Sequence, residues 1–145
     1  MIVVDAGVVA EVLLGTAAGR AADPHLRNAS SLHMPHFAVL ETASVLRGWL
    51  RSGQVSLRRA EQALENLASF PAQRWPDHLP LARAWELRDN ATVYDAAYVA
   101  LAEILGATLL TTDHRLARGV RPVARCPIIE IGARPPTPQA HPSSV

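Results

Sequence analysis

The chain has 145 residues, of which 49% are hydrophobic and 19% are charged, which is enough to form one globular domain with a sizeable core. Its 14 basic residues are all arginine and stand against 13 acids, so the net charge of +1 provides no global field for a polyanion. The lack of lysine excludes a P-loop phosphate site and any Schiff-base mechanism. A single cysteine, Cys126, excludes an internal disulfide and a cysteine zinc site, and it favours a cytoplasmic protein.

Neither a signal peptide nor a membrane span is expected. Residues 1–15 are apolar, but no basic residue precedes them, and Asp5 and Glu11 interrupt them. No apolar run reaches the roughly 18–20 residues that cross a bilayer. Residues 133–145 contain four of the 11 prolines and no apolar periodicity, so we expect a folded domain over 1–132 and a disordered, Pro-rich tail over 133–145.

Strands and helices alternate in the first half of the chain. The apolar run at its start is typical of a strand buried on both faces. Asp23 and Pro24 are the expected N-cap and first residue of one helix, and Ser56 is the expected N-cap of another. The predicted elements are strands at 1–4 and 32–34 and helices over 8–14, 21–31, 36–52 and 57–67.

The same alternation continues in the second half. Thr92 starts a helix that is apolar almost all round, and Gly106 ends it. Asp113 directly follows a second buried strand and starts a short helix. The predicted elements are strands at 73–75, 107–111 and 128–131 and helices over 79–88, 92–105 and from 113 onward.

This order of elements predicts an α/β fold in which helices cover both faces of a parallel sheet. In such folds, functional sites lie at the carboxyl ends of the strands. Asp5 and Asp113 each follow an apolar strand. We therefore expect both side chains at one edge of the sheet.

Four acidic residues stand at positions that a stable core alone would not require. Asp5 and Asp113 end strands, and Asp95 lies in the first turn of the apolar helix. Glu41 lies inside its predicted helix, where its neighbours one turn away are Phe37 and Val45.

Purely structural roles are the alternative for each acid. Asp5 and Asp113 could cap the helices that follow, and Thr92 and Asp95 have the spacing of a capping box. One cap contributes only about 0.5–2 kcal/mol, which is enough to explain a single aspartate. Glu41 could instead extend its carboxylate to solvent or to an arginine.

Together the four acids favour a metal site. Carboxylates that converge on one edge repel each other, and a hard divalent cation such as Mg²⁺ relieves the repulsion with oxygen ligands and water. The six histidines have no metal-binding spacing, although His114 could assist beside Asp113. Such a metal site suits phosphodiester hydrolysis, in which the ion activates water and neutralises the phosphate.

Three stretches of the sequence carry a family resemblance. They are MIVVDAGVVAEVLLG around Asp5, MPHFAVLETASVLRGWLRSG around Glu41, and LARAWELRDNATVYDAAYVALAEILGATLLTTDHRLAR, which contains Asp95, Thr111 and Asp113. Over residues 1–131 the chain resembles a PIN-domain ribonuclease of the VapC toxin type, from VapBC toxin–antitoxin pairs. The four acids occur in the order and spacing of that family's acids.

The resemblance implies a PIN-like, three-layer α/β/α fold with a central, mostly parallel sheet. It implies a metal-dependent endoribonuclease that uses Mg²⁺, with Mn²⁺ as the alternative ion, and leaves a 3′-hydroxyl and a 5′-phosphate. It also implies a homodimer and a cognate VapB-like antitoxin that occupies the acidic site. The implied metal ligands are Asp5, Asp95 and Asp113, with Thr111 orienting Asp113 and Glu41 positioning a water or a second ion.

One departure from the family is Gly7, where many members have a serine or threonine. This puts one hydroxyl contact in doubt, and the metal site is unaffected. RNA is the implied substrate, and the sequence does not rank the arginines that could face it, which include Arg47, Arg51, Arg115 and Arg118.

Three other functions are weighed against the nuclease. A receiver-like signalling domain requires adjacent early acids and a lysine after a late strand, and this chain has neither. A haloacid-dehalogenase-like phosphatase requires D-x-D, but Gly7 stands at the third position. A PIN-like domain that binds RNA or a partner without cutting is disfavoured because all four acids are present.

Overall fold

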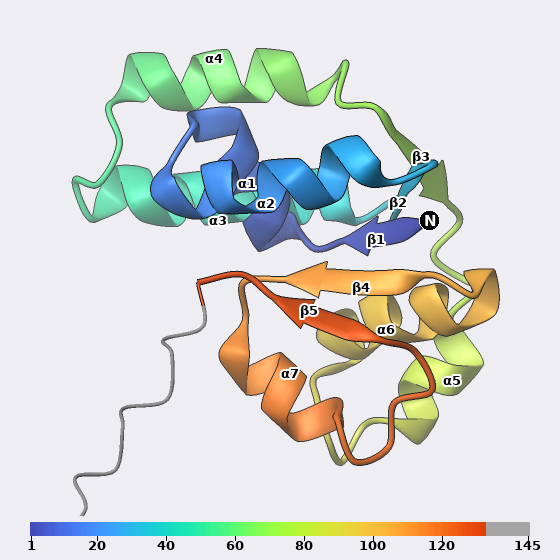
Figure 1. Cartoon of the computed structure of the whole chain (residues 1–145). Coiled ribbons are helices and arrows are strands. Elements are labelled where there is room, and N and C mark those ends of the chain that lie inside the picture. The colour runs from blue at the N-terminus through green and yellow to red at the C-terminus, as the bar shows by residue number, and fades with distance from the viewer. Residues whose placement is uncertain (133–145) are drawn as a thin grey trace, which may run out of the picture.

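The computed structural model describes residues 1–132 and forms one parallel sheet between two layers of helices (Figure 1). The strands are β1 (Ile2–Val4), β2 (Leu32–Pro35), β3 (Ala72–Trp75), β4 (Thr108–Thr111) and β5 (Ile128–Glu130). The helices are α1 (Ala6–Leu14), α2 (Ala17–Asn28), α3 (Ala38–Arg51), α4 (Leu57–Leu67), α5 (Leu81–Glu86), α6 (Val93–Leu105) and α7 (His114–Val120).

The strand order is β3-β2-β1-β4-β5, and every pairing is parallel. The chain proceeds from β1 outward to β3 and then crosses back to β4 on the other side of β1. The direction of winding therefore reverses between β1 and β4, and this is where parallel sheets form binding crevices. The predicted α/β class, with a parallel sheet covered on both faces, is confirmed.

The two helical layers divide the chain into an early and a late part. Helices α1 to α4 pack against one another on one side of the sheet, and α5 to α7 lie together on the other side (Figure 1). Helix α6 crosses β1, β2 and β4, which explains why its residues 96–102 are all buried. Val3, Val4, Leu109 and Leu110 are fully buried in the two central strands. The continuous apolar runs at 1–4 and 107–111 thus reflect strands that are covered on both faces.

One predicted helix begins at the wrong place. The segment expected over 21–31 is part of α2, which starts with Thr16 as its N-cap and places Pro24 inside the helix. The Thr16 hydroxyl accepts a hydrogen bond from the Gly19 N–H (3.1 Å). Asp23 is not the N-cap and instead pairs with Arg27 one turn later (2.6 Å). The other elements differ from the predictions by a few residues at their ends, where boundaries are least determined.

No helix within residues 1–132 is both long enough and apolar enough to cross a bilayer. The Pro-rich tail predicted over 133–145 lies outside the described residues.

Helix α2 packs on α1 through Gly19. A Cβ atom at this position would lie 2.2 Å from the carbonyl oxygen of Glu11, so only glycine permits the contact. We predict that Gly19→Ala lowers the free energy of unfolding by about 1–3 kcal/mol in chemical denaturation, because backbone atoms must move apart. Gly48 provides the matched control: it lies inside α3 with open space around it, so Gly48→Ala should stabilise by about 0.5–1 kcal/mol. Equal effects of the two substitutions would contradict the close helix contact.

Candidate active site

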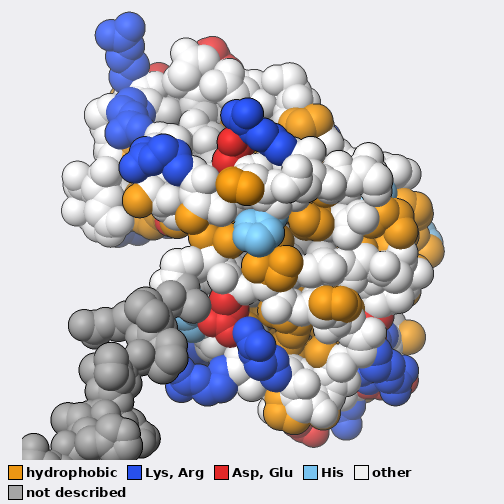
Figure 2. Space-filling model, in the orientation of Figure 1, with side chains coloured by type: hydrophobic (Ala, Val, Ile, Leu, Met, Phe, Trp, Pro, Cys, Tyr) orange, Lys and Arg blue, Asp and Glu red, His pale blue; other side chains and the backbone are white. Residues whose placement is uncertain are grey.

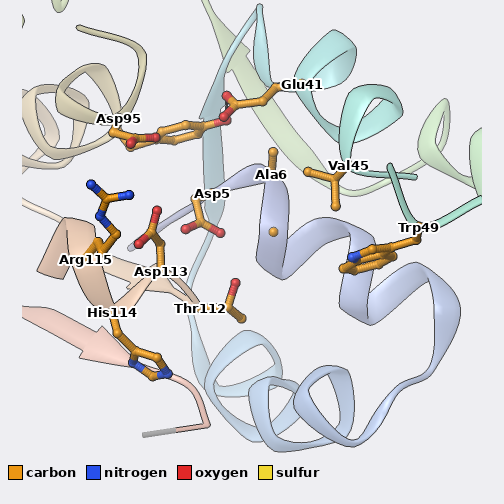
Figure 3. Close-up of a pocket in the computed structure, with 12 residues that line it drawn as sticks. Asp5, Ala6, Glu41, Val45, Trp49, Asp95, Thr112, Asp113, His114 and Arg115 are labelled. Carbon is orange, nitrogen blue, oxygen red and sulfur yellow. Dashed lines mark hydrogen bonds between the residues drawn. The ribbon is translucent and has the colours of Figure 1, made fainter. Parts of the chain in front are cut away.

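A pocket of about 490 Å³ opens at the carboxyl edge of the sheet, where the two helical layers meet (Figure 3). All four acids singled out from the sequence line it, and they come from four segments that are far apart in the chain. The lining residues are Asp5, Ala6, Gly7, Glu41, Val45, Trp49, Asp95, Tyr98, Thr112, Asp113, His114 and Arg115.

Asp5 is the most deeply buried acid, with 6% of its surface exposed. Its Oδ1 accepts a hydrogen bond from the N–H of Val8 (2.8 Å) and caps α1, while its Oδ2 accepts one from the hydroxyl of Thr111. Burial raises the pKa of Asp5 to about 6, and the charges of Asp113 and Glu41 act in the same direction, while the two hydrogen bonds oppose the shift. Asp5 is therefore both a helix cap and a member of the acidic pocket whose charged form is disfavoured by burial.

Thr111 connects the acids that follow β1 and β4. Its hydroxyl donates to Asp5 and accepts from the main-chain N–H of Asp113 (2.9 Å). The Oδ1 of Asp113 accepts from the N–H of Leu116 (3.0 Å), which caps α7. The capping alternative thus holds for Asp5 and Asp113 without removing either side chain from the pocket.

Glu41 lies in the first turn of α3 and not, as predicted, in the interior of the helix. The hydroxyl of Tyr98, which is fully buried in α6, donates to Glu41 Oε2 (2.8 Å). Burial raises the pKa of Glu41, and the charges of Asp95 and Asp113 raise it further. The hydrogen-bond partner of this glutamate is therefore a tyrosine from the opposite layer, and not the arginine of the structural alternative.

Asp95 enters the pocket from the first turn of α6. Its N–H donates to the hydroxyl of Thr92 (3.2 Å), which is one half of the predicted capping box. Burial raises the pKa of the Asp95 carboxyl and the charge of Asp113 adds to this, while Arg115 acts in the opposite direction.

The basic residues near the acids differ in their orientation. Arg115 lines the pocket beside Asp95 and Asp113 and points toward them (Figure 3). His114 points away from the acids, and its Nδ1 contacts Glu130 on β5 (2.8 Å). The other candidate arginines, at positions 47, 51 and 118, are exposed and do not line this pocket.

Sequence reasoning missed three other residues that line the pocket, namely Tyr98, Trp49 and Thr112. In the sequence, each of these residues fits a pattern that is also typical of a core or loop position. Gly7 was a signal that could have pointed to Thr112. Glycine within a helix is less favourable than alanine by about 1 kcal/mol, so a glycine there indicates a close contact that excludes a side chain. A Cβ atom at Gly7 would lie 2.5 Å from the hydroxyl oxygen of Thr112, so the glycine makes room for that hydroxyl beside Asp5.

The donor set suits a hard divalent cation. Within residues 1–132, no three carboxylate, imidazole or thiol groups already form the close cluster of a completed metal cage. Mg²⁺ does not need one, because it retains several waters and binds through one or two carboxylates. Burial, and to a smaller extent the charges of the neighbouring acids, raises the pKa values of Asp5, Glu41 and Asp95, and a bound cation would relieve both effects.

The raised pKa of Asp5 predicts a pH-dependent stability in metal-free buffer. The unfolded chain releases this proton near the ordinary pKa of 3.8, whereas the folded chain holds it up to about pH 6. The folded state then binds more protons in this range, so its free energy of unfolding falls as the pH rises through it. Between pH 3.8 and about pH 6, the free energy of unfolding of the wild type should fall by on the order of 2 kcal/mol relative to that of Asp5→Asn. Urea unfolding at a series of pH values measures this difference.

Asp89→Asn is the matched control, because Asp89 is exposed and lies outside the pocket. Its stability should follow that of the wild type at every pH. A constant difference between the wild type and Asp5→Asn across the range would contradict the raised pKa.

Comparison with known proteins places this chain in a family. The PIN domain model matches residues 2–121. Ribonuclease VapC12 of Mycobacterium tuberculosis is 39% identical over 118 residues, which cover 81% of this chain and 91% of that protein. Ribonuclease VapC9 of the same organism is 38% identical over 128 residues, covering 88% and 96% of the two chains.

Solved structures agree with the fold. A protein of Pyrobaculum aerophilum superposes with a TM-score of 0.60 at 26% identity, covering 81% of this chain and 84% of that one. VapC20 of M. tuberculosis, a sarcin–ricin loop cleaving toxin, also gives a TM-score of 0.60, with coverage of 81% and 94%, and at 18% identity it supports the fold alone. On the strength of the domain match and the two close sequence relatives, this chain belongs to the PIN-domain family and, within it, to the VapC proteins.

Proposed function

We propose that the protein is a metal-dependent endoribonuclease and the toxin of a type II toxin–antitoxin pair. The observation that carries the proposal is the shared pocket of Asp5, Glu41, Asp95 and Asp113, with Arg115 at its margin. Four carboxylates repel a phosphodiester unless a cation stands between them, so hydrolysis of a phosphodiester at this pocket requires such a cation. The names of the ribonuclease relatives support RNA as the substrate class.

In the proposed mechanism, Asp5, Asp95 and Asp113 would hold Mg²⁺, or Mn²⁺ in its place. The bound ion supplies Lewis-acid polarisation of the phosphate and lowers the pKa of water. Thr111 keeps Asp5 and Asp113 in fixed relative positions through its two hydrogen bonds. Together these residues provide a fixed set of oxygen ligands, and the ion that they would hold would bind the phosphate in their place.

Glu41 and Arg115 act on the reactants directly. Glu41, held by the hydroxyl of Tyr98, orients the attacking water or a second ion. Arg115 binds a phosphate oxygen, as its planar guanidinium suits this contact. Water attacks phosphorus and the bond to the 3′-oxygen breaks, so the products are a 3′-hydroxyl and a 5′-phosphate.

The family also supplies proposals for partners and location. A VapB-like antitoxin would bind the toxin and block the pocket, and two toxin chains would form a homodimer. The proposed place of action is the cytoplasm, where the RNA substrate and the antitoxin are made.

Asp95→Asn tests the proposed activity. The substitution removes one negative charge and retains the size of the side chain, so the fold should persist while cleavage of RNA falls by more than the roughly 10–100-fold that loss of an outer-shell partner costs. The measurement is mapping of cleavage ends in total RNA incubated with the purified chain, with Mg²⁺ and with EDTA. Asp89→Asn, which changes an exposed aspartate outside the pocket, should cleave like the wild type.

Two results would contradict the proposal. Full activity of Asp95→Asn would remove Asp95 from the mechanism, and activity that persists in EDTA would remove the metal. Absence of cleavage by the wild type, together with binding of RNA, would favour the PIN-like domain that binds without cutting.

A further inference from the structure

Trp49 forms a wall at the end of the acidic pocket opposite Arg115 (Figure 3). It projects from the last turns of α3, and Ala6 and Val45 lie between it and the acids. The indole also lines a smaller pocket of about 110 Å³ on its other side, between α1 and the start of α4. It is therefore a partly exposed aromatic surface within the pocket.

Packing against other residues buries only part of the Trp49 side chain. Trp49 lies at the edge of a small apolar cluster formed by Ala10, Leu46 and Ala63. Among residues 1–132, its indole N–H has no hydrogen-bond partner, whereas the indole of Trp75 donates to His33 (3.0 Å). Figure 3 shows the nitrogen edge of Trp49 turned toward the acids. Because Trp49 is only partly buried, its indole N–H and ring face are accessible to a ligand in the pocket.

The two ends of the pocket differ in chemistry. Arg115 provides a cation at one end, the carboxylates occupy the middle, and Trp49 with Val45 provides an aromatic and apolar surface at the other end. A second pocket of about 200 Å³ shares Asp95, Asp113 and Arg115 and continues past the cationic end. A ligand that complements this sequence of surfaces has a phosphate at its centre, a flat aromatic group on one side, and a continuing chain on the other.

We propose that Trp49 is a stacking subsite for one unpaired nucleobase next to the phosphate held at the acids, so that the substrate enters as single-stranded RNA. This inference rests on the proposed function, because it takes the pocket to be the site of RNA cleavage. Bases within a duplex are stacked on each other and expose only their edges, so a base reaches an aromatic side chain only when it is unpaired.

Arg115 gives the strand a contact beyond the acids. It lines both the acidic pocket and the second pocket, and Figure 2 shows arginine side chains on both helical layers. A strand that leaves the acids past Arg115 can contact this phosphate-binding side chain while one of its bases lies on Trp49 at the opposite end. Sequence-tolerant stacking of this kind accompanies a positively charged path in single-strand binding proteins.

The test compares Trp49→Phe with Trp49→Leu in the full chain. Both substitutions keep an apolar side chain in the small cluster, but only phenylalanine keeps an aromatic face. In an Asp95→Asn background, which prevents turnover, we expect Trp49→Leu to weaken binding of a fluorescein-labelled single-stranded RNA by about 5- to 100-fold. Trp49→Phe should remain within a few-fold of the parent, and binding of the same sequence as a blunt duplex should change with neither substitution.

Fluorescence gives a second, independent readout. Unlabelled single-stranded RNA should quench tryptophan emission in the parent, and Trp49→Phe should abolish this quenching. Trp85→Phe is the matched control, because Trp85 is exposed, lies outside the pocket and contacts Arg88 (5.0 Å from the guanidinium carbon to the ring centroid). Single-stranded RNA should still quench the tryptophan emission of Trp85→Phe. Thermal melting should establish that all variants are folded.

The outcomes test the stacking subsite separately from the proposed ribonuclease activity. Single-strand affinity that is equal in folded Trp49→Leu and the parent overturns the stacking subsite even if the wild type cleaves RNA. Loss of affinity in Trp49→Leu supports the subsite even if no cleavage is found. A loss of affinity for the antitoxin, with RNA affinity unchanged, would assign the indole to the protein partner and overturn the proposal.

Discussion

Like charges held close together in a partly buried pocket are the constraint on which this structure depends. Asp5, Glu41, Asp95 and Asp113 meet where the sheet reverses its direction of winding, and burial together with mutual repulsion raises the pKa values of the first three. A chain selected for stability alone would replace several of them, because each charge that is desolvated without a cation opposes folding. The protein instead retains all four and surrounds them with compensating hydrogen bonds.

Those hydrogen bonds come from ordinary elements of the fold. Helix N-termini stabilise Asp5 and Asp113, the hydroxyl of Thr111 connects the two, and Tyr98 reaches from α6 to Glu41 on the opposite layer. The side chains of Asp5 and Asp113 therefore cap helices and also line the acidic pocket. A capping role for these two aspartates is thus compatible with the proposed catalytic role.

Sequence reasoning predicted the sheet and the grouping of the acids because both follow from local patterns. Apolar runs identify buried strands, and an aspartate directly after such a strand must lie at the carboxyl edge. It could not find the Tyr98–Glu41 contact, since the two residues are 57 positions apart and the tyrosine resembles any buried aromatic residue. It also misplaced the start of α2, because Asp23 and Pro24 form a typical helix start while the true cap, Thr16, depends on the close packing of Gly19 against α1. The proposed role of Trp49 could not be predicted from the sequence either, since only the assembled fold brings the indole into the pocket of the acids.

The most direct test of the central claim is anomalous diffraction from crystals of the wild type and of Asp95→Asn grown with Mn²⁺. The account predicts a manganese peak in the pocket, in coordination contact with carboxylate oxygens of at least two of Asp5, Asp95 and Asp113, that is weakened or lost in the variant. A manganese peak bound elsewhere on the protein, with none in the pocket, would contradict the claim that these acids form a cation site.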